Sequence, residues 1–217
     1  MGNGIFITFE GSEGAGKSTQ VRLLTEHLRK TGLPVLTLRE PGGTELGEEI
    51  RTLVRRVDFA EAPCAEAELL LFLASRAQLV REEILPALHN GMVVICDRYC
   101  DSSIAYQGAA RSLSLEQIGS INAFAIGKCV PDITFLLDLD PLEGLRRIRL
   151  RHGSEADDRM ERESVAFFEK VRNGYRKLAQ VEPARFVILD AHKPVEMVHE
   201  KIYDLLCQRF GTTFKNH

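Results

Sequence analysis

The stretch Glu10–Thr19, EGSEGAGKST, decides the fold. It fits the P-loop pattern G-x-x-x-x-G-K-[ST], with Lys17 and Ser18 in the last two positions. Glycines at this spacing let backbone N–H groups turn toward a phosphate at the N-terminus of a helix. We expect Lys17 to reach the outer phosphates and Ser18 to hold a magnesium ion. The residues predicted to bind ATP here are Gly11, Ser12, Glu13, Gly14, Ala15, Gly16, Lys17, Ser18 and Thr19.

The neighbouring segments favour a P-loop over the alternative, a cluster of turn glycines beside a surface lysine. The apolar, partly β-branched run at 5–9 is typical of a buried strand. After the loop, Val21, Leu24 and Leu28 recur at helical spacing until Thr31-Gly32 ends the pattern. Strand, glycine loop and helix follow one another in the order that a phosphate-binding loop requires.

Four further apolar runs predict short strands, and helical patterns separate them. Five strands alternating with helices predict an α/β fold, a five-stranded parallel sheet with helices on both faces. No internal repeat or linker interrupts the chain, so residues 1–217 are predicted to form one domain with a loose tail at 211–217. The additional strands are predicted at 35–38, 92–96, 133–137 and 185–189.

The composition excludes several classes of protein. The 217 residues are 44% hydrophobic and 27% charged, as in an ordinary globular protein, and the net charge of -3 argues against a general nucleic-acid binder. No apolar run approaches 18 residues and no basic signal region precedes the first strand, so we expect a cytoplasmic protein without a membrane partner. The five cysteines form no C-x-x-C pair, and we predict reduced thiols rather than a metal site.

Charged residues follow two of the predicted strands where these end. The segment Arg39–Thr44, REPGGT, follows the second strand, and Asp97-Arg98-Tyr99 follows the third. Ligands of parallel sheets bind outside the carboxyl ends of the strands. Asp97 therefore suits a metal ion and Arg98 suits a phosphate, with a structural salt bridge as the alternative.

Two other patterns admit both a structural and a functional interpretation. Phe72 and Arg76 share one face of a helix predicted over 66–88, and their spacing alone favours a core phenylalanine and a solvated arginine. The arginine-rich segment at about 143–163 is poor core material. It is either a solvated helix end or a mobile lid that closes over phosphates, which arginine grips with two N–H groups at once.

The P-loop by itself does not choose between a kinase, a GTPase, a motor and a switch. A GTPase normally carries an Asn-Lys-x-Asp guanine-binding motif, which this sequence lacks, and a motor normally needs a longer chain. The arginine-rich segment favours a small phosphotransferase whose lid excludes water from the γ-phosphate.

Taken together, the motifs resemble those of the thymidylate kinases. The order and spacing match from the P-loop to about residue 190, through REPGGT at 39–44, DRY at 97–99, SSIAYQG at 102–108, PDIT at 131–134 and DDRME at 157–161. The resemblance implies a P-loop kinase domain that transfers the γ-phosphoryl group of MgATP to dTMP, giving dTDP for dTTP biosynthesis. It also implies a homodimer.

The resemblance assigns roles to the acceptor site. Phe72 is expected to stack on thymine and Arg76 to donate to its O4, which replaces the structural interpretation of this pair. Glu13 is expected to accept from the 3′-OH, and Tyr106 to leave no room for a 2′-hydroxyl. Asp97 joins Ser18 as a predicted metal ligand. The predicted substrate-binding residues are Glu13, Arg39, Pro41, Arg51, Phe72, Arg76, Arg98, Ser103, Tyr106 and Gln107.

Catalysis is expected to need charge neutralisation but no general base, because the acceptor phosphate is already mostly anionic at pH 7. The P-loop interior carries no basic residue, which resembles the bacterial type of the family, in which the lid supplies arginine. Arg147 is expected to flank adenine. The predicted catalytic residues are Lys17, Arg98, Arg149, Arg151 and Arg159. Two alternatives stay open: a related kinase acting on dUMP or a deoxynucleoside, and a P-loop regulatory protein that binds ATP without turnover.

Overall fold

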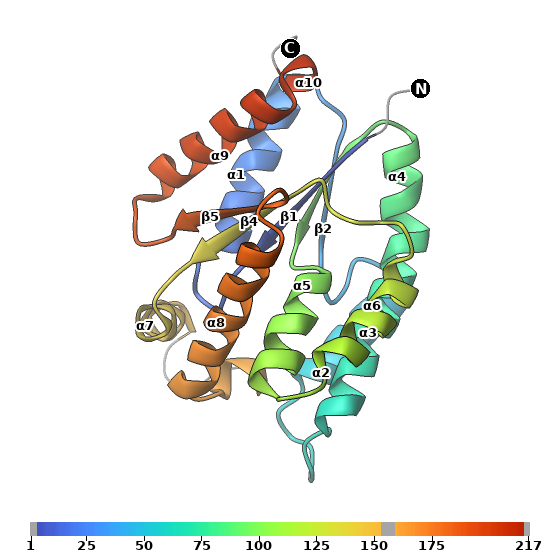
Figure 1. Cartoon of the computed structure of the whole chain (residues 1–217), viewed down its shortest axis with the longest axis vertical. Coiled ribbons are helices and arrows are strands. Elements are labelled where there is room, and N and C mark those ends of the chain that lie inside the picture. Colours follow the sequence, from blue (N-terminus) through green and yellow to red (C-terminus); the bar gives the residue numbers. More distant parts are fainter. Residues whose placement is uncertain (1–3, 153–158, 215–217) are drawn as a thin grey trace.

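A five-stranded parallel sheet forms the centre of the computed structural model, which describes residues 4–152 and 159–214 (Figure 1). The strand order is β2-β3-β1-β4-β5, and every neighbouring pair is parallel. All five predicted strands are confirmed, each shifted or extended by one residue at most. They are β1 (Ile5–Glu10), β2 (Val35–Arg39), β3 (Val93–Asp97), β4 (Ile133–Asp138) and β5 (Phe186–Asp190).

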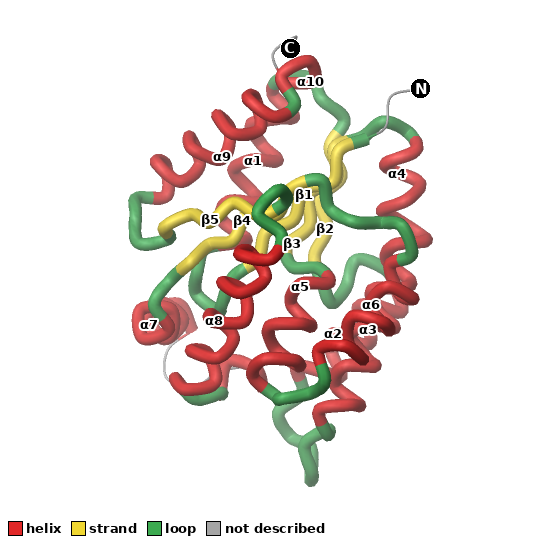
Figure 2. The backbone as a smooth tube through the Cα atoms, in the orientation of Figure 1, coloured by secondary structure: helices red, strands yellow, loops and turns green. Residues whose placement is uncertain are grey.

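Helices cover both faces of the sheet, as the sequence predicts (Figure 2). They are α1 (Lys17–Lys30), α2 (Glu45–Arg55), α3 (Ala65–Leu79), α4 (Leu85–His89), α5 (Cys100–Ser103), α6 (Leu115–Ile126), α7 (Pro141–His152), α8 (Val165–Val181), α9 (Val195–Arg209) and α10 (Gly211–Phe214). Two π-helical segments, η1 (Val80–Ile84) and η2 (Ile104–Ala110), and a 3₁₀ turn, η3 (Arg159–Arg162), complete the described elements.

The register of the central strands positions the site. β1 pairs with β3 so that Phe9 lies opposite Asp97, and β2 pairs with β3 so that Arg39 lies opposite the same residue. The three strands therefore end side by side, and the loop that follows each one emerges at the same edge of the sheet. This edge brings the P-loop together with the REPGGT and DRY segments, which lie far apart in the sequence.

Apolar side chains of the two sheet faces fill separate parts of the core. One cluster joins β1, β3 and β4 to α1 and α9. Another joins the opposite face of β1 and β3 to η1 and α4, and it contains the buried thiols of Cys96, Cys100 and Cys129. These cysteines thus pack as small hydrophobes, as expected for reduced thiols.

The polar segment at 102–108 is helical, although its sequence predicts no element. It forms the end of α5 and most of η2, which pack against α8. Gly174 of α8 permits this close approach, because a Cβ there would lie 2.8 Å from Ala109 Cβ and 3.1 Å from Ala105 Cα. Tertiary packing thus gives this segment a helical conformation that its small, polar residues do not signal.

The loose tail predicted for 211–217 is wrong over Gly211–Phe214. These residues form α10, and the Phe214 side chain is only 2% exposed in the cluster of α1 and α9. Burying one aromatic ring gives the end of the described chain the apolar anchor that its composition does not suggest. Residues 215–217, which the same prediction covers, lie outside the described part.

Candidate functional site

The P-loop is folded around the ammonium group of Lys17. Lys17 Nζ donates to the carbonyl oxygens of Gly11, at 3.1 Å, and Ser12, at 2.9 Å. Gly14 and Gly16 have φ of 72° and 91°, a conformation that favours glycine. The side chain is buried, and burial together with the nearby Arg98 holds the Lys17 pKa below its ordinary value. The loop therefore presents a fixed positive charge where α1 begins.

The two predicted metal ligands lie together. Ser18 Oγ donates to Asp97 Oδ2 at 2.5 Å, which joins the first turn of α1 to the end of β3. Within the described residues, no group of three or more histidine, cysteine or acidic side chains could hold a metal ion. A hydroxyl and one carboxylate are the donor set expected for Mg²⁺ that takes its other ligands from phosphates and water.

A cleft of about 840 Å³ runs from the P-loop across the strand ends. Most of the predicted site residues line it, including Phe72, Ser103 and Gln107, so the structure brings the predicted nucleotide and acceptor residues together. The predicted residues that line the cleft are Glu13, Gly14, Ala15, Gly16, Lys17, Ser18, Thr19, Arg39, Pro41, Arg51, Phe72, Arg76, Asp97, Arg98, Ser103, Tyr106, Gln107 and Arg147. Gly11 and Ser12 are not part of this lining, and they contribute carbonyl groups to Lys17 instead.

Arg98 lies between the P-loop and the part of the cleft that Phe72, Ser103 and Gln107 line. Its backbone has a φ of 69°, which is uncommon for a residue with a side chain and marks a strained position. Nη2 contacts Glu13 Oε1 at 2.6 Å and Tyr106 Oη at 2.9 Å, while Nη1 donates to the Gly11 carbonyl at 3.0 Å. Although burial raises the pKa of Glu13, Arg98 and then Lys17 lower it below its ordinary value. Glu13 is therefore an ionised carboxylate in the cleft wall.

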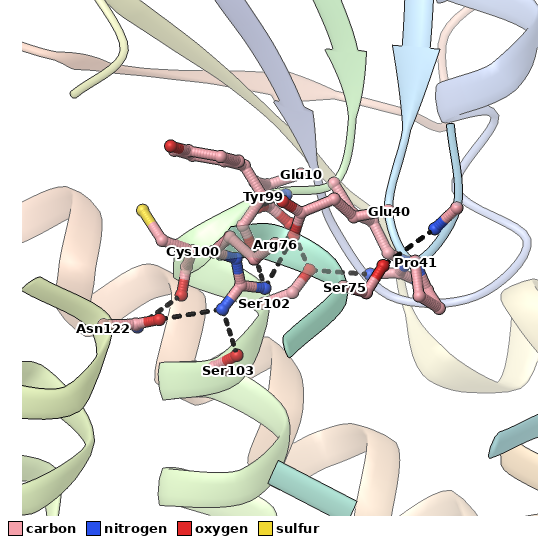
Figure 3. A network of polar contacts seen from close by, with 12 residues as sticks. Glu10, Glu40, Pro41, Ser75, Arg76, Tyr99, Cys100, Ser102, Ser103 and Asn122 are labelled. Carbon is pink, nitrogen blue, oxygen red and sulfur yellow. Dashed lines mark hydrogen bonds and ion pairs between the residues drawn. The ribbon is translucent and has the colours of Figure 1, made fainter. Parts of the chain in front are cut away.

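Arg76 belongs to the cleft lining but is only 1% exposed, and Figure 3 shows the network of polar contacts around it. Nε and Nη2 contact Glu40 Oε2 at 2.8 and 2.7 Å, and Nη2 also donates to the Tyr99 carbonyl at 3.1 Å. Nη1 donates to Ser103 Oγ and Asn122 Oδ1, both at 2.8 Å. All five N–H donors of a guanidinium thus have partners within the protein. Donation to a base would therefore require Arg76 to share an N–H group or to exchange one of these contacts.

The other acceptor-side arginines are held in place at the cleft rim. Arg39 forms an exposed ion pair with Glu48 at 2.8 Å. Arg51 donates to the carbonyl oxygen of Pro41 at 3.1 Å, and the peptide bond before Pro41 is cis. The REPGGT loop and α2 are thereby joined along one wall of the cleft.

The arginines assigned to the lid are not all at the cleft. Arg147 lines it and donates to Glu143 at 2.8 Å and to the Ala191 carbonyl at 3.2 Å. Arg149 is exposed on α7, and Arg159 donates to Glu68 Oε2 at 2.5 Å; neither lines the cleft. The side chain of Arg151 and residues 153–158 lie outside the described part. The catalytic roles of Arg149, Arg151 and Arg159 remain predictions.

The sequence interpretation missed several residues that support the site from behind. Glu10, Ser102 and Tyr175 are linked by hydrogen bonds, and the two hydroxyls also contact Arg98. Glu10 and Ser102 belong to motifs that the sequence displays, but the burial of Glu10 and its hydrogen bond to Ser102 were not apparent. Tyr175 lies in the middle of α8 without a recognisable signal.

Comparison with known proteins agrees with this geometry. The family model for thymidylate kinase matches residues 9–202. The thymidylate kinase of Chlorobium chlorochromatii is 50% identical over 206 residues, covering 91% of this chain and 92% of its own, and that of Deinococcus radiodurans is 47% identical over 209 residues, covering 96% and 99%. The crystal structure of thymidylate kinase from Ehrlichia chaffeensis superposes with a TM-score of 0.75 at 33% identity, covering 94% of this chain and 98% of its own. The P-loop nucleotide-kinase fold is thereby confirmed, and the chain belongs to the thymidylate kinase family.

Proposed function

We propose that the cleft transfers the γ-phosphoryl group of ATP to the phosphate of dTMP, releasing ADP and dTDP. Membership of the family makes the chain a kinase of dTTP synthesis. The observation that carries the residue assignments is the joint position of Lys17, Arg98 and Phe72 on one cleft. Lys17 belongs to the donor end, Phe72 to the acceptor end, and Arg98 lies between them.

In this reaction a phosphate oxygen of dTMP forms a bond to the γ-phosphorus, and the bond from that phosphorus to the β,γ-bridging oxygen breaks. The second pKa of a phosphate monoester is about 6, so no side chain needs to remove a proton at neutral pH. Arg98 holds and orients the acceptor phosphate, while Lys17 and the P-loop N–H groups stabilise charge on the donor phosphates. Catalysis on this chain consists of positioning and charge neutralisation.

Ser18 and Asp97 are the residues that would hold Mg²⁺, and the ion would neutralise part of the phosphate charge of ATP. Arg147, whose guanidinium contacts the Ala191 carbonyl, is the proposed neighbour of the adenine. ATP with Mg²⁺ is thus the proposed donor.

The acceptor end is proposed to select thymine and deoxyribose. Phe72 offers a ring for stacking. Ser103 offers a hydroxyl donor for the O4 acceptor of thymine, and Arg76 can donate to it by sharing or exchanging one of its present contacts. Cytosine presents an amino group at this position, which would place donor against donor. Tyr106 is buried and held by Arg98 and Glu13, so its ring is a fixed wall for the sugar.

A panel of acceptors tests this assignment. With saturating MgATP, we expect turnover of dTMP to exceed that of dCMP and of the ribose form of TMP by about 10²-fold or more, since unpaired buried donors discriminate strongly. A coupled assay for ADP gives kcat/KM for each acceptor, with dUMP and thymidine in the same panel. Equal turnover of dTMP and dCMP would contradict the base assignment, and ATP binding without turnover of any acceptor would favour a regulatory protein.

The proposed assembly is a homodimer in the cytoplasm. Large apolar side chains are exposed on neighbouring helices, with Leu70 of α3 60% exposed and Phe124 of α6 84% exposed. Such a patch is typical of a protein interface. The structure has, among its described residues, no helix that is both long and apolar enough to cross a membrane.

A further inference from the structure

Glu10 is a fully buried carboxylate that does not line the cleft. It is the last residue of β1 and directly precedes the P-loop. Oε1 accepts from the backbone N–H of Tyr99 at 2.8 Å (Figure 3). Oε2 accepts from the hydroxyls of Ser102 and Tyr175, both at 2.7 Å. Three donors, two from the start of α5 and one from α8, thus converge on one side chain.

These three donors surround Arg98. The Tyr99 N–H belongs to the peptide that directly follows Arg98, whose φ of 69° has to be held by its surroundings. The Ser102 and Tyr175 hydroxyls lie 3.4 and 3.2 Å from Arg98 Nη1 and 2.9 Å from each other. Glu10 therefore constrains Arg98 twice, through its backbone and through the hydroxyls beside its guanidinium.

The protonation of Glu10 changes near neutral pH. Burial and then the charge of Asp101 raise its pKa to about 7, while Arg98 opposes the shift. The ionised carboxylate accepts at both oxygens and can therefore accept from all three donors. The protonated carboxyl, in contrast, carries an O–H group that must itself donate. The titratable and charged groups that face Glu10 from the surrounding elements are Asp101, Arg98, Tyr175, Tyr106, Lys17, Cys96 and Cys100.

We propose that Glu10 is a positioning residue that fixes Arg98, and with it the acceptor phosphate, relative to the P-loop. The inference rests on the proposed function, in which Arg98 binds the phosphate of dTMP. Because Glu10 is continuous with the P-loop and bonded to the Arg98 segment, one residue sets the relation between donor and acceptor phosphates. Near-attack geometry is sensitive to such spacing, since a displacement of about 1 Å can cost about 10²-fold in rate.

The test uses Glu10→Gln and Tyr175→Phe in the full chain, with Asp138→Asn as the matched control. Asp138 is also a strand-end carboxylate bound by α8, through Arg172 and Arg176, but it does not contact Arg98. We expect Glu10→Gln to lower kcat/KM for dTMP by about 10²-fold and Tyr175→Phe by about tenfold. Affinity for thymidine, which lacks the phosphate, should change by less than about twofold in both, and Asp138→Asn should affect neither measurement by more than that.

Three further measurements separate positioning from a structural role. In the wild type, kcat/KM for dTMP should rise with pH through about 7, and Glu10→Gln should remove this rise while keeping the ionisation of the dTMP phosphate near pH 6. Stability should depend on pH in the opposite direction, because the folded state raises the pKa of Glu10 from 4.5 to about 7. The contribution of Glu10 to the free energy of unfolding is therefore fully present below about pH 4.5, and it is lost as the pH rises through about 7. Replacement of Arg98 by Lys should add little to the loss in Glu10→Gln, since both act on one contact.

Three results would overturn the proposal: unchanged kinetics for dTMP in Glu10→Gln, an equal loss of affinity for dTMP and thymidine, or full additivity with Arg98→Lys. If Glu10→Gln does not fold, Tyr175→Phe decides, and unchanged dTMP kinetics there would overturn it too. A wild-type protein that does not phosphorylate dTMP would contradict the proposed function instead.

Discussion

The arginines of the acceptor half and those of α7 are held in opposite ways. Arg76 and Arg98 have side chains that are 1% and 14% exposed, and each pairs with a carboxylate from a distant part of the chain, Glu40 or Glu13. Arg146 and Arg147 are 63% and 34% exposed and share Glu143 of their own helix. The ion pairs of Arg76 and Arg98 thus join distant parts of the fold, whereas those of Arg146 and Arg147 lie within the helix that carries them, with one added contact from Arg147 to the Ala191 carbonyl.

This difference separates the two tasks of a phosphotransferase. A buried arginine with partners on several elements presents one geometry and suits recognition. An exposed ion pair within one helix contributes little to stability, so its arginine can exchange the carboxylate for a phosphate at a small free-energy cost. We therefore expect substitutions in the two groups to differ in which quantity they change.

The largest effect is expected from Arg149→Ala, which tests whether an exposed α7 arginine acts in the transition state. We expect kcat and kcat/KM to fall together by about 10³-fold, because an arginine that stabilises a transferring phosphoryl group is worth about 10³–10⁵. Steady-state kinetics at saturating ATP and dTMP measure this. Arg146→Ala, on the same helix and paired with Glu143, is the control and should stay within about threefold.

A normal kcat in Arg149→Ala would remove this residue from the catalytic set. The same assay on Arg151→Ala and Arg159→Ala would then locate the missing charge. An increase in the KM for ATP alone would indicate ground-state binding, which is the result we expect for Arg147→Ala.

The next effect concerns stability and contrasts Arg76 with Arg147. Arg76→Met leaves Glu40 buried without its partner, and we expect a loss of about 3–5 kcal/mol in the free energy of unfolding. Arg147→Met removes an ion pair within one helix at the protein surface and should cost far less than Arg76→Met. Urea unfolding of both variants measures the difference. Equal losses would show that burial does not distinguish the two groups.

The smallest effect is expected from Glu13→Gln. Glu13 holds Arg98 at 2.6 Å and is also the proposed acceptor for the 3′-OH. Loss of its charge should raise the KM for dTMP by about tenfold, the equivalent of about 1.4 kcal/mol. It should also narrow the preference for dTMP over an analogue with azide at the 3′ position. If both parameters stay at wild-type values, Glu13 is not part of the sugar site.

The sequence predicted the parts of this site that depend on local chemistry. Lys17, Ser18 and Asp97 were found because a phosphate loop and a strand end have recognisable residues in a fixed order. The neutralising partners were not found, because burial of Glu40 against Arg76 depends on packing between segments 36 residues apart. Tyr175 was missed for the same reason, since its hydrogen bond to Glu10 spans 165 residues.

The roles of the arginines in α7 could not be predicted for a different physical reason. The many arginines of this segment indicated that it is poor core material, and Arg147 does line the cleft. The spacing of arginines in the sequence cannot show which one faces a ligand, because an exposed arginine can form ion pairs of similar free energy with several partners. Arg159, in η3, is a different case: its side chain is 14% exposed, and its ion pair is made with Glu68, which is 1% exposed, and not with a group in the cleft.

Gly14 and Gly144 have no side chains, and their surroundings leave no room for one. A Cβ on Gly14 would lie 2.3 Å from the Gly144 carbonyl oxygen, and a Cβ on Gly144 would lie 2.5 Å from that of Glu13. The P-loop and the start of α7 thus meet backbone to backbone, and the obstructing atoms cannot rotate away. In a saturation mutagenesis experiment scored by growth, Gly144 would be as intolerant as Lys17, although it offers neither charge nor hydroxyl. Apparent essentiality at this position would report the spacing between two main chains rather than chemistry.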